Sequence, residues 1–244
     1  VRYTYTIAGE AEVSYEPLHN GTKERTDRNI TAVKLSSVLG DNEYSLTATE
    51  QSQDFVDATA VATFKVVAGE ELTAEVKHAG EWVHHAVYVD LDANGFNASI
   101  EEGSEWKPAG DLMAYAFYNN GGSSDVYGYN SVGTSLAGQD RHMPAIPAFK
   151  APEQPGTYRM RFVQTWCSID PAGDNDGKFG DFKSNGDQIV DVILEVTDAT
   201  GIGAISVDGN NDVYSLDGRK VNVKMGKKLN KGIYIVNGKK VYVK

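Results

Sequence analysis

The chain of 244 residues carries 23 basic and 34 acidic side chains, which gives a net charge of −11. Residues 201–244 alone are positive, at +6, so the first 200 residues carry −17. Such an acidic main part argues against nucleic acid as a partner, because nucleic acid is bound by a basic face. No run of 18 apolar residues occurs, which argues against a transmembrane helix. The single cysteine, Cys167, excludes an intrachain disulfide.

Alternation of apolar and polar residues with a period of two dominates the first 196 residues and predicts β-strands. The expected strands cover residues 2–7, 31–35, 44–48, 60–67, 72–76, 81–89, 112–118, 156–165 and 188–196. The strand at 81–89 is apolar on both faces and is expected at the centre of a sheet. Many strands at this spacing predict an all-β fold, an antiparallel, jelly-roll-like β-sandwich over residues 1–198.

Two long polar stretches, residues 119–141 and 167–186, interrupt this pattern. Long loops on a β scaffold often carry binding residues, although they also occur as simple insertions. Trp106, Tyr127 and Tyr129 lie among polar residues, and exposed aromatic rings in such surroundings stack on sugars. We therefore expect these three residues to bind a ligand. The alternative is that the rings pin their own loops to the sandwich.

A second, smaller unit is expected at the C-terminal end. The strand pattern breaks at residues 199–203, which contain two glycines and predict a linker. Residues 204–244 then form a basic β-module, in which Asp217-Gly218 and Asn237-Gly238 favour two-residue hairpin turns. About 40 residues make a marginal core, so we expect this module to need the sandwich or a partner for stability.

One loop has the residue spacing of a calcium site, D-x-D-x-N-G-x5-E, directly after the expected central strand. The predicted ligands are Asp90, Asp92, Asn94, the carbonyl oxygen of Phe96, and Glu101. Calcium takes six to eight oxygen ligands, and Gly95 allows the sharp turn that lets them converge. The sequence therefore predicts a structural calcium ion in this loop. The alternative is an acidic, solvated β-turn.

No catalytic residue is predicted, because the chain contains no G-x-S-x-G, H-E-x-x-H, Walker or dinucleotide motif. His84 and His85 are adjacent, so in a strand they point to opposite faces and do not bind one ion together. We expect both histidines to be packed or hydrogen-bonded within the sandwich.

Residues 87–96, Val-Tyr-Val-Asp-Leu-Asp-Ala-Asn-Gly-Phe, resemble the Y-x-D-x-N-x-D-G-x-F segment of GEVED-type domains. Residues 155–162 resemble the later G-T-x-R-M-R element of that family, and residues 64–70 resemble its F-x-V-x-A-G-E strand. The similarity covers about residues 55–198, although the acidic signature that names the family is degraded within residues 187–192. The resemblance implies a secreted β-sandwich accessory module, of a kind attached in many proteins to peptidases or carbohydrate-active enzymes.

Residues 213–221 and 231–241 resemble type IX secretion sorting tails, which carry the pattern Y-x-x-x-G-x-x-V followed by G-x-Y-I-V-x-x-G-x-K. This resemblance covers about the last 35 residues. It implies engagement of that secretion machinery and a secreted protein, or one on the outer-membrane surface of a Gram-negative bacterium, with any signal peptide already removed. The alternative is an ordinary small β-domain that packs on the sandwich.

These observations together predict an exported or cell-surface, non-catalytic binding module with a structural calcium loop, which recognises carbohydrate or a surface partner. One alternative is a structural or adhesive surface protein in which the sandwich is a spacer. Another is an enzyme with an unrecognised carboxylate site, although no nucleophile, metal triad or cofactor motif supports that alternative.

Overall fold

The computed structural model describes residues 13–17, 21–80, 83–104, 107–120, 126–133, 145–165, 171, 186–198, 213–215, 218–221, 232–236 and 239–243. The chain divides into two compact units, Val1–Val196 and Thr197–Lys244. The expected strand at residues 2–7 and the aromatic residue Trp106 lie outside the described residues.

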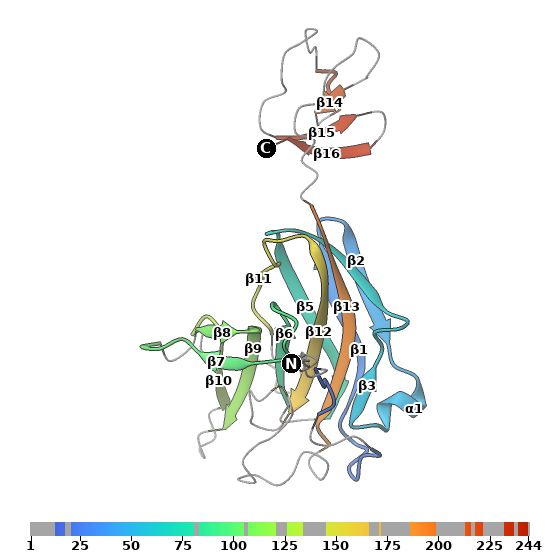
Figure 1. Cartoon of the computed structure of the whole chain (residues 1–244), viewed down its shortest axis with the longest axis vertical. Coiled ribbons are helices and arrows are strands. Elements are labelled where there is room, and N and C mark those ends of the chain that lie inside the picture. The colour runs from blue at the N-terminus through green and yellow to red at the C-terminus, as the bar shows by residue number, and fades with distance from the viewer. Residues whose placement is uncertain are drawn as a thin grey trace, which may run out of the picture. The chain divides into compact units, whose positions relative to one another are not determined.

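The first unit contains two main sheets (Figure 1). The smaller sheet has the strand order β11 (Phe149–Lys150), β5 (Glu71–Ala79), β1 (Asn29–Ser37) and β2 (Gly40–Ser45). All of its strand pairs are antiparallel. In β5 the apolar residues Leu72, Ala74 and Val76 are buried while alternate residues face outward, as the period-two pattern predicted.

The larger sheet has seven strands. Its order is β10 (Val126–Asn130), β9 (Leu112–Asn120), β6 (His84–Val89), β12 (Gly156–Thr165), β13 (Gln188–Thr197) and β3 (Phe55–Asp57), and β4 (Thr63–Val67) also pairs with β13. The β13–β3 pair is parallel, which the sequence did not predict. A short helix, α1 (Ala48–Gln51), begins at Thr47 with a capping box formed with Glu50.

The two sheets pack face to face around one apolar core, which confirms the all-β sandwich. Strands of both sheets contribute to it, among them Val33 and Leu35 from β1, Leu72 from β5, Val87 from β6, and Phe162 from β12. Phe64 of β4 meets Phe162 edge-on, with ring centroids 6.2 Å apart. Burying this apolar surface is the main force that holds the sheets together.

The outer face of the larger sheet is also covered. Strand β6 is buried along its whole length, as expected for a central strand, and it pairs with β9 on one side and β12 on the other. A second apolar cluster lies on this outer face and contains Ala86, Tyr88, Leu112, Tyr115, Val163 and Ile189, with Phe55 and Phe96 packed against it. Outward-pointing polar side chains close to this cluster, such as Arg161 and Asp191, are therefore buried.

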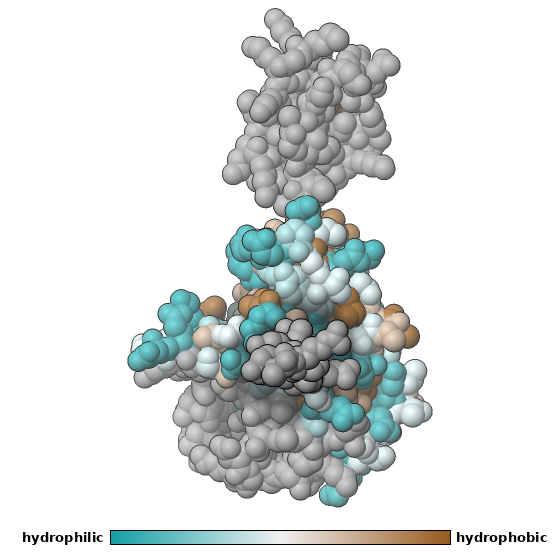
Figure 2. Space-filling model, viewed as in Figure 1, coloured by the Kyte–Doolittle hydropathy of each residue, from teal (hydrophilic) through white to brown (hydrophobic). Residues whose placement is uncertain are grey.

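A small hairpin of β7 (Ala98–Ile100) and β8 (Pro108–Gly110) projects from the side of the sandwich (Figure 1). The end of this projection is hydrophilic in Figure 2. In the described part of the chain, no helix has the length and apolar character needed to cross a bilayer.

The two adjacent histidines lie on opposite faces of β6, as predicted. His84 contacts the ring of Phe117, with centroids 4.9 Å apart, and His85 contacts His78 at 4.7 Å. Burial lowers the pKa of His84 to about 3, and it lowers the pKa of His85 well below the ordinary value. Both imidazoles are therefore neutral in the folded protein at pH 7.

The second unit contains a three-stranded antiparallel sheet of β14 (Val213–Ser215), β15 (Gly232–Val236) and β16 (Lys239–Val243). Val236 pairs with Lys239, so two residues join β15 to β16, as the Asn-Gly dipeptide predicted. This unit is the small C-terminal β-module expected from the sequence.

Candidate cation site and the neighbouring pocket

A short N-terminal segment, residues 13–17, lies across the outer face of the larger sheet. Its central residue is Tyr15, whose hydroxyl donates a hydrogen bond of 2.5 Å to Asp90 Oδ2. The guanidinium of Arg159 lies 4.5 Å from the centroid of the Tyr15 ring, and the carbonyl oxygen of Tyr15 accepts a hydrogen bond from Arg161. Burial and the Asp90 carboxylate raise the pKa of Tyr15 to about 12. Tyr15 thus ties the segment to Asp90 at the end of β6 and to β12.

Beneath this segment, two arginines of β12 share one carboxylate of β13. Asp191 is fully buried, and its two oxygens accept hydrogen bonds of 2.7 Å from Arg161 Nε and Arg159 Nε. Arg161 adds a second bond of 2.8 Å, and Arg159 also pairs with Asp57 of β3 at 2.8 Å. The ring of Phe96 lies 4.4 Å from the Arg161 guanidinium. This network links three neighbouring strands of the sheet.

Next to the network, three aspartates converge. Each of Asp90, Asp92 and Asp111 offers one carboxylate oxygen, and these oxygens all lie within 4.8 Å of one another. Asp90 and Asp111 are buried, whereas Asp92 is exposed. Burial raises the pKa of Asp111, and the Asp90 and Asp92 charges add to this rise against two backbone hydrogen bonds that lower it. We call Asp90, Asp92 and Asp111 the acidic cluster.

The hydrogen bonds of the acidic cluster leave one buried oxygen unsatisfied. Asp111 accepts bonds from the backbone amides of Leu91 (2.9 Å) and Asn97 (2.8 Å). Asp90 Oδ2 accepts bonds from Tyr15 and from the Gly95 amide. Asp90 Oδ1 is buried and has no hydrogen-bond partner within the part of the chain that the structure describes, and Asp90 is only 3% exposed. A buried, unpaired carboxylate oxygen is costly unless a cation or another ligand satisfies it.

Antiparallel pairing brings the cluster together. Strand β6 runs into Asp90, and β9 begins just after Asp111; Tyr88 pairs with Leu112 in the sheet. The end of one strand therefore meets the start of the other. The β7–β8 hairpin closes the loop between them, because Asp111 donates its backbone N–H to the Asn97 carbonyl at 2.7 Å.

Only part of the ligand set predicted from the sequence lies in this cluster. Asp90 and Asp92 are members, and Asn94 lies beside them with its amide donating to Asp92 Oδ2 at 2.5 Å. Glu101 is not a member: it sits at the end of the hairpin, where its carboxylate contacts Lys107 Nζ at 2.5 Å. The Phe96 ring packs on Tyr15 and Tyr88. Sequence reasoning missed Asp111, which lies outside the twelve-residue motif.

Gly110 positions Asp111, and we expect Gly110→Ala to displace it. Gly110 has φ +67°, and a Cβ at this position would lie 2.5 Å from the Asn97 carbonyl oxygen. The left-handed backbone and the clash together predict a loss of about 1–3 kcal/mol in the free energy of unfolding. Urea denaturation would measure it. Gly103→Ala is the control, because Gly103 has a similar positive φ (+80°) but a Cβ added there would meet nothing within 4 Å. An equal loss in both variants would contradict the role of the close contact.

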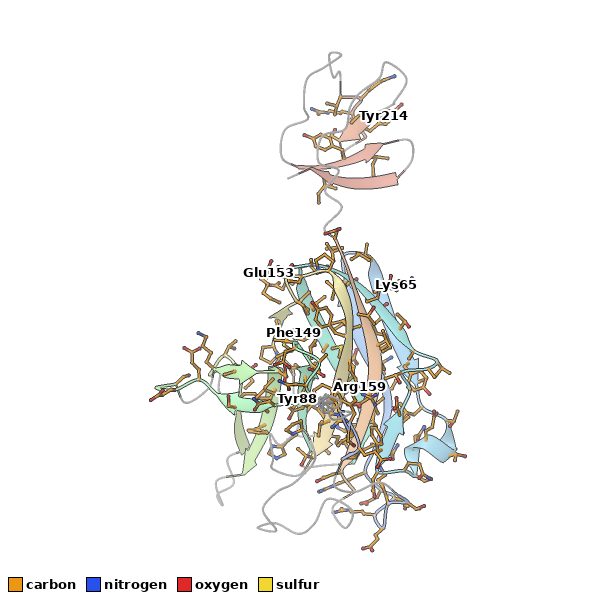
Figure 3. All side chains as sticks on the ribbon, viewed as in Figure 1. Lys65, Tyr88, Phe149, Glu153, Arg159 and Tyr214 are labelled. Atoms are coloured by element: carbon orange, nitrogen blue, oxygen red, sulfur yellow. The ribbon has the colours of Figure 1, made fainter. Side chains whose placement is uncertain are left out.

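Two open pockets adjoin this region. One, of about 330 Å³, is lined by Tyr15, Asp90, Leu91, Asp92, Ala93, Thr157, Tyr158 and Arg159. The other, of about 580 Å³, is lined by Val13, Ser14, Tyr15, Glu16, Phe55, Asp57 and Arg159. Figure 3 labels Arg159 and Tyr88, which lie on the neighbouring strands β12 and β6 at the middle of the sheet. The pockets share Tyr15 and Arg159, and the smaller one reaches two members of the acidic cluster.

The aromatic residues predicted to bind a ligand are not part of these pockets as far as the structure describes them. Trp106 lies outside the described residues. Tyr127 and Tyr129 lie in β10, at the edge of the larger sheet, and only their backbone is described. Their role in recognition stays a prediction.

Comparison with known proteins does not assign this site to a family. The chain matches no protein-family model, and a search of curated proteins found no significant relative.

Proposed function

We propose that the protein is an exported or cell-surface, non-catalytic recognition module whose sandwich is stabilised by a calcium ion held by Asp90, Asp92 and Asp111. The observation that carries the proposal is the buried Asp90 Oδ1, which has no hydrogen-bond partner among the described residues, in a side chain that brings one oxygen within 4.8 Å of oxygens of Asp92 and Asp111. Three like charges this close, two of them buried, repel one another. A divalent cation between them would remove that repulsion and satisfy the unpaired oxygen.

The chemistry of the donors favours calcium. All three are carboxylates, and hard oxygen donors suit Ca²⁺ or Mg²⁺, whereas imidazole and thiolate suit zinc and copper. The cluster is asymmetric, with two buried aspartates fixed by backbone amides and one exposed aspartate. Ca²⁺ tolerates irregular coordination better than Mg²⁺, which demands a near-ideal octahedron.

Export and the non-catalytic role rest on the sequence. The resemblance of residues 213–221 and 231–241 to sorting tails supports export, and the lack of a nucleophile or cofactor motif supports binding without turnover. Carbohydrate or a surface partner is the proposed ligand class. Surface display that fails when residues 203–244 are removed would test the export role.

The cation site is tested by thermal melting in calcium and in EDTA. A ligand that binds only the folded state stabilises it by about 2.7 kcal/mol at one hundred times its Kd, so calcium is expected to raise the Tm. Asp111→Asn should abolish this rise, because it removes one of the three charges. Glu101→Gln should keep it, because Glu101 lies in the hairpin and pairs with Lys107.

The two variants distinguish the cluster seen in the structure, which includes Asp111, from the ligand set that the sequence motif predicts, which includes Glu101. Loss of the calcium response in Glu101→Gln together with its retention in Asp111→Asn would favour the twelve-residue loop. A wild-type Tm that is unchanged by millimolar calcium would overturn the cation site altogether.

A further inference from the structure

We propose that the small pocket beside the acidic cluster binds a neutral glycan, with two neighbouring sugar hydroxyls coordinated directly to the calcium ion. This inference rests on the proposed function, since it requires the cation. The geometric basis is that Asp90 and Asp92 both line the pocket of about 330 Å³. A cation held by these residues would therefore lie at the wall of an open pocket.

The protein leaves coordination positions free at this site. Calcium takes six to eight oxygen ligands. Several carboxylate oxygens are already engaged: both oxygens of Asp111 accept backbone hydrogen bonds, and Asp90 Oδ2 accepts two. One oxygen from each aspartate gives three ligands, so about three to five positions would be filled by water or by a ligand. Since Asp92 is the exposed member, these positions open toward solvent and the pocket.

The charges around the pocket favour a neutral ligand. Three carboxylates and one Ca²⁺ leave a net charge of −1 at the site. Arg159 is the basic residue among the described residues of the lining, and it is already paired with Asp191 at 2.7 Å and with Asp57 at 2.8 Å. An acidic sugar would thus meet a negative site without an unpaired cation to compensate it. Vicinal hydroxyls can coordinate calcium without adding charge.

The second pocket provides room for a ligand longer than one sugar. It is about 580 Å³ in volume and shares Tyr15 and Arg159 with the first. Its lining adds the ring of Phe55 and the carboxylates of Glu16 and Asp57, a combination of apolar faces and hydrogen-bond acceptors that suits the faces and hydroxyls of a sugar. An oligosaccharide bound at the calcium can therefore contact both pockets.

The test is affinity electrophoresis of the full chain through gels that contain yeast mannan, galactomannan, dextran or polygalacturonate. In calcium we expect retardation by at least one of the three neutral glycans, and EDTA should weaken it at least tenfold. Polygalacturonate, which is acidic, should not retard the protein. Retardation by polygalacturonate alone, by no glycan, or equally with and without EDTA would overturn the inference.

A pocket-filling variant distinguishes this inference from the cation site itself. Thr157→Trp places a large side chain in the pocket and leaves all three carboxylates of the acidic cluster in the chain, so it should keep the calcium-dependent rise in Tm and lose the retardation. Thr63→Trp, at an exposed position of β4 outside both pockets, is the matched control and should keep both responses. Calcium stabilisation with unchanged glycan binding in Thr157→Trp would reject the pocket while leaving the cation site intact.

Discussion

Replacing Asp191 by alanine is expected to lower the free energy of unfolding by about 3–5 kcal/mol, the range measured when one partner of a buried ion pair is removed. Asp191 is fully buried and is the common carboxylate of Arg159 and Arg161. Arg161 is itself only 2% exposed, so the variant would leave its charge buried without a counterion. The two remaining bonds of Arg161, to the carbonyls of Tyr15 and Pro171, do not neutralise that charge.

Guanidinium denaturation of the wild type, Asp191→Ala and Asp27→Ala would measure the effect. Asp27 is the control, because its carboxylate pairs with Arg25 at 2.6 Å but is 64% exposed, and surface pairs contribute about 0–1 kcal/mol. If Asp191→Ala were no more destabilising than Asp27→Ala, the result would show that the buried ion pairs between β12 and β13 do not stabilise the fold.

The Arg159 and Arg161 pair shows how far the sequence predicts the fold. Alternation with Met160 and Phe162 predicts that the arginines face away from the main core, and the structure confirms this. A local pattern does not reveal what covers the outer face. Phe96 and Tyr15 lie more than 60 residues away in the chain, yet both rings contact these guanidiniums. Long-range packing of this kind turns a polar strand face into a buried network.

Long-range pairing of strands also explains why the acidic cluster forms. The spacing of Asp90 and Asp92 is local, and the sequence predicts both. Asp111 joins them because the end of β6 lies beside the start of β9, with Tyr88 opposite Leu112. A carboxylate that directly precedes the strand expected at residues 112–118 is a recognisable signal only once that pairing is known. The motif instead favours Glu101, which the β7–β8 hairpin places against Lys107.

Lowering the pH from 7 to 5 is expected to destabilise the fold by about 4 kcal/mol through His84 and His85. Both folded-state pKa values lie below the ordinary value of 6.5, because burial disfavours the imidazolium, and nearby Arg28 and His78 oppose its charge further. The unfolded chain therefore binds more protons below pH 6.5, and the stability present above that pH is lost as the pH falls. At pH 5 each neutral imidazole contributes about 2 kcal/mol to this loss.

Denaturation of the wild type and of the double variant His84→Gln, His85→Gln at pH 7 and pH 5 would isolate this contribution. The double variant is expected to be less stable at pH 7, since both residues are buried, but its stability should change little between the two pH values. Exposed carboxylates with a lowered pKa, such as Asp27 and Asp41, lose their contribution only below their ordinary value of 3.8, outside this window. A double variant that keeps the full pH dependence of the wild type would show that other groups bind the protons, because the difference between two pH values does not depend on how much the substitutions themselves destabilise the core.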